Sequence, residues 1–197
     1  MPLWGATDSD ESKPKNLTTA EKKQVFANAS GWVLEAGSAL SGNDNASATP
    51  EVLVAIGGLS TSIGAADVTE VEWITTAADK SEGFTLSVRV RYNEAVTVTG
   101  SPTIAVTNGN QGSGSGRGPH TLVYASGSGT NELVFSLAIA AGNAATNADD
   151  VLTVGAQNIA KPGGATMKDT GGDGTTDSAV AISADQGTAC GSITVTA

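Results

Sequence analysis

Residues 84–92 read FTLSVRVRY, and this stretch decides the fold class. Large apolar side chains occupy every second position, and the positions between them hold Thr85, Ser87, Arg89 and Arg91. Successive side chains of a β-strand point to opposite faces of a sheet, so this period of two predicts a strand with one core face and one solvated face. The two arginines are expected on the solvated face. The side chains predicted to enter the core are Phe84, Leu86, Val88, Val90 and Tyr92.

Short apolar stretches recur on both sides of this strand, separated by turn-forming Gly, Ser, Asn and Pro residues. A turn at Asn93 and Glu94 is expected to end the strand, and the glycine-rich segment 109–119 is expected to be a flexible loop. Many short strands with turns between them indicate a β-sandwich. Further strands are predicted at residues 32–34, 52–56, 68–74, 96–98, 104–106, 122–124, 133–139, 151–154, 180–182 and 193–195.

The beginning of the chain has a different pattern. It starts with a polar, proline-containing arm, and Thr18 with Glu21 then fits a capping box that would begin a short helix running to about Asn28. Two of the predicted strands follow. We therefore predict an all-β protein in which an extended arm, a short helix and a small β docking module, together residues 1–76, precede a β-sandwich in residues 77–197.

Charge and composition exclude several classes of function. The chain has 20 acidic and 10 basic residues, a formal net charge of −10. Nucleic acids and anionic membranes are bound by clustered Lys and Arg, so neither is an expected partner. No apolar segment has the length of a secretory signal or a membrane span, and Cys190, the single cysteine, cannot form an intramolecular disulfide. We expect a protein that is made in a cytosol.

His120 and Cys190 carry the side chains most often used in catalysis. His120 follows Gly118 and Pro119 at the end of the glycine-rich segment, and no acid–base partner can be identified for it, so a solvated loop histidine is expected. Cys190 has no base or positive charge beside it in the sequence and is expected to be unreactive. We predict no catalytic residue, no cofactor and no enzyme activity.

Acidic residues near the C-terminus raise the question of a metal site. Asp149 and Asp150 are adjacent, and Asp169, Asp173 and Asp177 form a spaced series. Calcium prefers several carboxylate and carbonyl oxygens. The spacing matches no calcium-loop pattern, so ordinary acidic turns are predicted and no metal site is assigned.

Three motifs resemble a bacterial immunoglobulin-like repeat that occurs in long secreted surface proteins of cyanobacteria and marine bacteria. They are YNEAVTVTGSP at residues 92–102, YASGSGT at 124–130 and MKDTG at 167–171. The resemblance covers about residues 82–172 and implies an immunoglobulin-like β-sandwich. It implies no activity, because one fold hosts many functions.

The opening MPLWG and the Lys-Pro-Lys arm after it resemble the start of small structural proteins of T-even-like marine cyanophages. This implies a virion protein that assembles in the host cytoplasm and is exposed on the particle surface, with capsid or other virion proteins as partners. Leu3 and Trp4 are predicted to be its partner-binding anchor, because a large aromatic side chain in a polar arm has no core of its own. In the alternative, Trp4 folds back onto Trp32 or Trp73.

The two resemblances together imply a non-enzymatic virion structural protein, a head decoration protein of a tailed phage, and they leave self-association into a homo-oligomer open. One alternative is a tail, baseplate or fibre-associated protein that uses the same domain as a spacer. Another is a glycan-binding adhesive module. Such a module would need exposed aromatic side chains for sugar faces, and few are available in this sequence.

Overall fold

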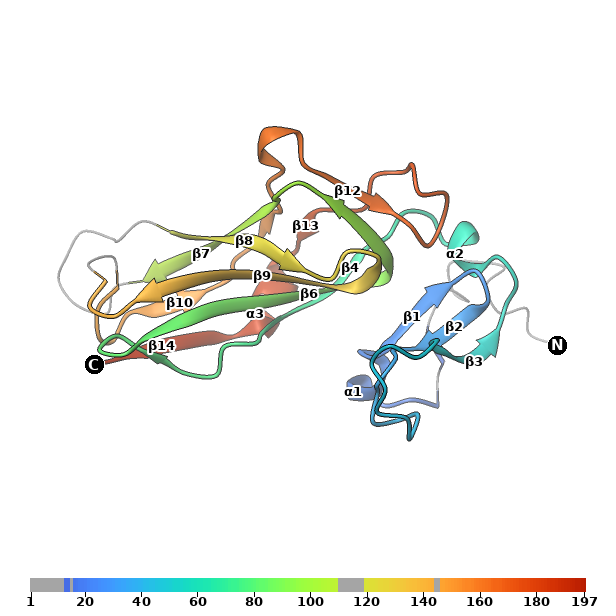
Figure 1. Cartoon of the computed structure of the whole chain (residues 1–197), viewed down its shortest axis with the longest axis horizontal. Coiled ribbons are helices and arrows are strands. Elements are labelled where there is room, and N and C mark those ends of the chain that lie inside the picture. Colours follow the sequence, from blue (N-terminus) through green and yellow to red (C-terminus); the bar gives the residue numbers. More distant parts are fainter. Residues whose placement is uncertain (1–12, 15, 110–118, 144–145) are drawn as a thin grey trace.

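Strand β6, Gly83–Thr99, is the longest element of the molecule (Figure 1). The computed structural model describes residues 13–14, 16–109, 119–143 and 146–197. Within β6 the side chains of Leu86, Val88, Val90 and Tyr92 are fully buried, whereas Thr85 is exposed. The predicted alternation is therefore confirmed. Phe84, near the start of the strand, is only half-buried.

The strand does not end at the turn expected at Asn93 and Glu94. It continues, and only its pairing with β9, Thr130–Ala140, is interrupted there. Glu94 pairs instead with Ala27 of β1, Val25–Asn28, which runs parallel to β6. The predicted turn is wrong, because the strand continues through an irregularity between Arg91 and Val96, after which its pairing with β9 resumes.

Seven further strands complete the larger part of the molecule. They are β4 Val68–Trp73, β5 Ala78–Asp79, β7 Thr103–Gly109, β8 His120–Ser126, β10 Val151–Thr153, β12 Thr166–Asp169 and β14 Ser192–Thr196. Strands β7, β8 and β9 are consecutive antiparallel neighbours and β6 lies beside β9, which is a Greek-key order. The sheet continues from β7 through β10 and β14 to β5, and both β4 and β12 pair with β6. Side chains from these strands enter one buried cluster, so the sheet wraps around a single core.

A two-stranded sheet and two short helical segments lie beside this core. They are β11 Gln157–Asn158, β13 Ala181–Ile182, the 3-10 turn η1 Pro162–Gly164 and the helix α3 Ala184–Cys190. Helix α3 is not predicted from the sequence, although Ser183 and Gln186 form a capping box at its start. Gly187 lets this helix approach closely, because a Cβ atom there would lie 2.7 Å from the carbonyl oxygen of Val154.

The N-terminal part forms a small module with its own core. It contains α1 Thr19–Lys22, β1, β2 Gly31–Leu34, β3 Glu51–Ala55 and α2 Leu59–Ser62. The three strands are antiparallel in the order β3-β2-β1, and Figure 1 shows them beside the larger part of the molecule. The buried side chains of this small core are Val25, Ala27, Trp32, Leu34 and Leu59.

The capping box at Thr18 is confirmed, but the helix it starts is shorter than predicted. Thr18 Oγ1 accepts a hydrogen bond from the Glu21 amide at 3.3 Å, and Glu21 Oε2 accepts one from the Thr18 amide at 2.8 Å. The helix does not reach Asn28, because Val25–Asn28 is strand β1 and pairs with β2. Gly31 starts β2 with a φ of +133°, and a Cβ atom there would lie 2.0 Å from a backbone oxygen of β3, so this close approach requires glycine.

Each predicted strand overlaps an observed one, which confirms the all-β class. The change between the two cores falls before residue 77. Leu59 belongs to the small core, whereas Ala66, Val68 and Val71 belong to the larger one. The division into a docking module at 1–76 and a sandwich at 77–197 stays a prediction. Strand β4, although it precedes residue 77, packs in the larger core. Most of the expected arm and most of the expected loop at 109–119 lie outside the described residues.

Two phenylalanines on neighbouring strands test this placement of the core. Phe135 of β9 is fully buried and its ring centroid lies 6.0 Å from that of Tyr124, whereas Phe84 is half-buried. We expect Phe135→Ala to lower the free energy of unfolding by about 3–5 kcal/mol. Phe84→Ala should lower it by less than about 3 kcal/mol, because part of that ring stays in water. Urea unfolding measures both, and equal losses would contradict the assigned burial.

Candidate functional site

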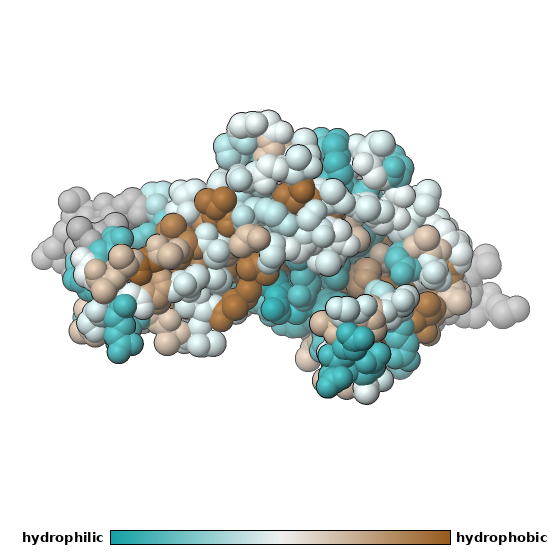
Figure 2. Space-filling view, in the orientation of Figure 1, coloured by the Kyte–Doolittle hydropathy of each residue, from teal (hydrophilic) through white to brown (hydrophobic). Residues whose placement is uncertain are grey.

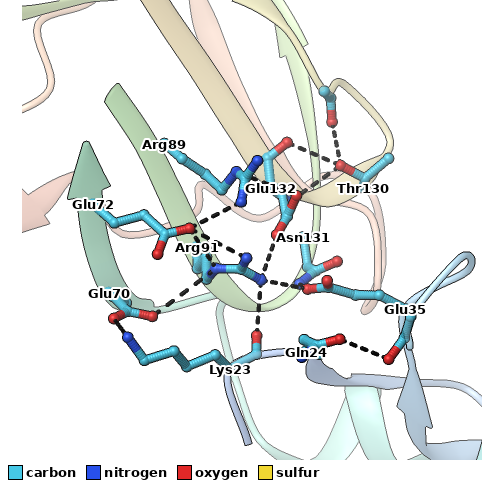
Figure 3. Close-up of polar contacts among 12 residues, drawn as sticks. Lys23, Gln24, Glu35, Glu70, Glu72, Arg89, Arg91, Thr130, Asn131 and Glu132 are labelled. Carbon is cyan, nitrogen blue, oxygen red and sulfur yellow. Dashed lines mark hydrogen bonds and ion pairs between the residues drawn. The ribbon is translucent and has the colours of Figure 1, made fainter. Parts of the chain in front are cut away.

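Arg91 is buried where the two parts of the molecule meet (Figure 3). Its Nη1 atom donates hydrogen bonds to Glu35 Oε1 at 2.8 Å and to the carbonyl oxygen of Lys23 at 3.0 Å. Lys23 precedes β1 and Glu35 follows β2, so both contacts come from the small module. The expectation that Arg91 is solvated is wrong. The residue does lie on the outer face of β6, but the small module covers that face and leaves 8% of the side chain exposed.

Glutamates of the larger part complete the surroundings of Arg91. Its Nε and Nη2 atoms donate to Glu72 Oε1 at 3.3 and 3.2 Å, Nη1 forms an ion pair with Glu132, and Nε lies 3.9 Å from Glu70 Oε2. The sheet register explains this convergence, because Glu70 of β4 and Glu132 of β9 stand directly opposite Arg91 on its two sides. We call this group the Arg91 cluster; it consists of Arg91, Glu35, Glu70, Glu72 and Glu132.

The Arg91 cluster contains four carboxyl groups and one guanidinium group, and these charges shift one another's pKa values. Burial disfavours the charged guanidinium, but Glu35, Glu132 and Glu72 outweigh burial and raise the pKa of Arg91. Burial also raises the pKa of Glu132, and the neighbouring Glu35 adds to that rise. Removing Arg91 would break its ion pair with Glu35, whereas Glu70 and Glu72 would keep Lys23 and Arg89 as partners. The arrangement therefore holds two packed bodies together.

Further polar contacts surround the cluster. Asn131 Nδ2 donates to Glu35 Oε1 at 2.7 Å, and Lys23 forms an ion pair with Glu70. Lys13 Nζ donates to the carbonyl oxygen of Lys22 at 2.6 Å, and burial lowers the pKa of Lys13 to about 8. On the face shown in Figure 2, hydrophilic residues gather where the two parts meet. A shallow pocket of about 340 Å³ opens beside the cluster; its lining includes Phe26, Glu35, Ala46, Asn131 and Glu132.

A second contact joins the two parts beside Ala95 of β6. Ser60 of α2 donates a hydrogen bond from Oγ to the carbonyl oxygen of Gly171, which follows β12. Asp169 Oδ1 accepts a hydrogen bond from the Gly172 amide at 2.9 Å. The motif at residues 167–171 therefore lies against the small module.

Strand β3 has a free edge in the described part of the chain. It stands at the end of the strand order and pairs with β2 alone. Val52 of β3 is 45% exposed, and Leu40, in the segment before it, is 42% exposed. An exposed strand edge presents unpaired N–H and C=O groups, so it is a template for a strand of another chain.

The predicted anchor residues, Leu3 and Trp4, lie outside the described residues. The side chains of the two other tryptophans make contacts within the fold. Trp32 is buried in the small core, and Trp73 Nε1 donates to the carbonyl oxygen of Gly191 at 3.3 Å. The anchor role of Leu3 and Trp4 stays a prediction.

His120 is buried, so the prediction of a solvated loop histidine is wrong. It is the first residue of β8 and points inward, with Nε2 3.4 Å from Asn108 Nδ2 and 3.3 Å from Thr146 Oγ1. Burial lowers the pKa of His120, and the nearby Asp150 opposes this shift. The ring is thus a polar part of the core rather than a group presented to solvent.

The remaining candidates have ordinary structural surroundings. Burial raises the pKa of Cys190 to about 11, so its thiol stays protonated near neutral pH. Asp173 accepts hydrogen bonds from the Thr175 and Thr176 amides at 2.8 Å each, and Asp177 pairs with Lys168 at 2.7 Å. Among the described residues, no three His, Cys, Asp or Glu side chains are arranged to hold a metal ion.

Comparison with known protein families, with curated proteins and with solved structures finds no match for this chain. In the part of the chain that the structure describes, no helix is both long and apolar enough to cross a membrane.

The two arginines of β6 provide a matched test of the junction. Arg91→Ala removes the buried positive charge from among four partly buried glutamates, so we expect it to lower the free energy of unfolding by about 3 kcal/mol. Arg89 pairs with Glu72 at 2.9 Å but is 31% exposed, so Arg89→Ala should cost about 1 kcal/mol or less. Urea unfolding of both variants makes the comparison, and similar losses would show that the burial of Arg91 does not matter.

Proposed function

We propose that this chain is a non-enzymatic structural protein of a virion, a head decoration protein of a tailed phage. In this proposal the N-terminal arm and the small module dock on the shell, and the larger part, an immunoglobulin-like β-sandwich, projects from it. The observation that carries the proposal is the free edge of β3, which offers backbone pairing to a neighbouring subunit.

The strand order supports the immunoglobulin-like part of the proposal. Greek-key connections are found in most β-sandwiches, and β6 to β9 have that order. The three motifs of the resemblance also take defined places in the fold. Residues 92–102 contain the end of β6, residues 124–130 make the hairpin between β8 and β9, and residues 167–171 contain the end of β12.

The chemistry of β3 supports docking by strand addition. A partner strand on its free edge would satisfy the exposed backbone groups and cover the side chain of Val52. The Arg91 cluster supports the same model, because it holds the docking module and the projecting part in one arrangement before binding. A preorganised binder loses less conformational entropy on association.

The first functional prediction concerns the arm. A chain lacking residues 1–16 and the variant Trp4→Ala should both bind undecorated heads of the parent phage less well than the full chain. Truncating a buried aromatic anchor removes about 2–4 kcal/mol of binding free energy, a loss of about 30-fold or more in affinity. Co-sedimentation with the heads measures occupancy, and urea unfolding verifies that each variant is folded. Equal binding by all three proteins would disprove the anchor role.

The second functional prediction concerns the edge of β3. Val52→Lys places a charge on that edge and should weaken head binding, because charged side chains block strand addition. Val123→Lys, at a residue of β8 that is 41% exposed, is the matched control and should leave binding unchanged. Equal effects would argue against docking through β3. Binding of the full chain to tails instead of heads would favour the tail or fibre alternative, and binding only to polysaccharide would favour the adhesive module.

A further inference from the structure

Glu94 is a buried acid that the proposed function does not use. Its side chain is 0% exposed, and neither carboxyl oxygen has a hydrogen-bond partner among the described residues. An ionised carboxylate in such a place has lost its water without gaining a donor or a cation, and a carboxyl group so placed normally takes up a proton.

The groups around Glu94 favour its protonated form. The charged side chains that face it are Asp169 of β12 and Asp67, which precedes β4, while β1 contributes Ala27. A Cβ atom at Gly171 would lie 2.6 Å from Glu94 Oε2 and 3.4 Å from Asp169 Oδ1, so the two carboxyl groups converge beside this glycine. Asp169 accepts a hydrogen bond from the Gly172 amide, whereas neither carboxyl oxygen of Glu94 accepts one among the described residues. The proton therefore belongs on Glu94.

We propose that Glu94 holds a proton in the folded protein and that its loss loosens the contact between the small module and the larger part. Glu94 and Asp169, together with Gly171 and Ser60, then form a pH-sensitive latch, which we call the Glu94 latch. It goes beyond the proposed function, because it concerns the isolated chain and does not depend on what the chain binds.

The Glu94 latch lies where the small module contacts the larger part, so a charge on Glu94 acts on that contact. Glu94 is the residue at which β6 pairs with β1 of the small module, and Gly171 accepts the hydrogen bond from Ser60 of α2. The amides of Thr170 and Gly171 donate to the carbonyl oxygen of Ala95 at 3.0 and 3.3 Å, so the segment after β12 is tied to β6 beside the acid. A second negative charge here would repel Asp169 and push this segment away.

The direction of the pH dependence follows from the two protonation equilibria. Burial, followed by Asp169 and Asp67, raises the pKa of Glu94 from 4.5 to about 8. The stability contributed by its proton is complete below pH 4.5, is lost as the pH rises towards 8, and changes no further above that. In the folded protein, the ionised form gains about tenfold over the protonated form for each pH unit.

Glu94→Gln tests the latch, because it keeps the shape of the side chain but cannot ionise. Glu51→Gln, at an exposed glutamate of β3, is the matched control. We expect hydrogen exchange at the Thr170 and Gly171 amides to accelerate in the natural chain and in Glu51→Gln, relative to Glu94→Gln at the same pH. The difference should be small at about pH 4.5, should grow as the pH rises and should exceed tenfold by about pH 8, with no further growth at about pH 9.

Three results would overturn the proposal. The first is an exchange ratio between the natural chain and Glu94→Gln that stays constant with pH. The second is a result obtained with Asp169→Asn, a variant that also tests the latch if Glu94→Gln does not fold. The negative charge of Asp169 is one cause of the raised pKa of Glu94, so Asp169→Asn should shrink the pH-dependent acceleration of exchange and end it at a lower pH than in the natural chain. A pH dependence identical to that of the natural chain would exclude coupling of the two acids.

The third result distinguishes a proton from a metal ion. Calcium or magnesium at a concentration on the order of millimolar should leave the unfolding midpoint of the natural chain unchanged at neutral pH. A midpoint that rises with either ion in the natural chain, but not in Glu94→Gln, would place a cation where we place the proton.

Discussion

The buried guanidinium of Arg91 is the interaction on which the rest of the structure depends. A positive charge between two apolar cores is stable only if carboxylates reach it from every side. Those carboxylates come from β4, from β9 and from the segment after β2, so this one side chain fixes the position of three elements relative to β6. The junction between the two parts of the molecule is therefore specific, whereas two cores joined by apolar contact alone could slide against each other.

The strand pattern could be predicted from the sequence because it is local. The alternation in residues 84–92 needs no knowledge of the neighbouring strands, and the capping box at Thr18 spans four residues. Part of the Arg91 cluster could also be predicted from the sequence. Glu70 and Glu72 repeat the spacing of Arg89 and Arg91, and two such strands side by side pair acid with base. Glu35 is 56 residues from Arg91, and no local pattern connects them.

Three of the incorrect predictions share one physical cause, because each rests on a polar residue whose local sequence favours solvent or a chain reversal. Glu94 lies in a strand that continues past it, and His120 begins a strand although it follows glycine and proline. In both cases tertiary packing overrides the local preference. Arg91 is the same case on the outer face of a strand, since the small module covers a surface that would otherwise be solvated.

The distribution of charge then limits how this chain can bind a partner. Lys13, Lys23, Arg89 and Arg91 are near the junction, where glutamates neutralise them, and the chain as a whole has twice as many acidic as basic residues. The remaining surface therefore carries an excess of negative charge, which keeps copies of the chain apart. In the proposed function, affinity for the particle would then come from backbone pairing and buried apolar surface, as the edge of β3 offers. Because the Arg91 cluster already fixes the two parts relative to each other, docking at that edge also orients the larger part without a further loss of entropy.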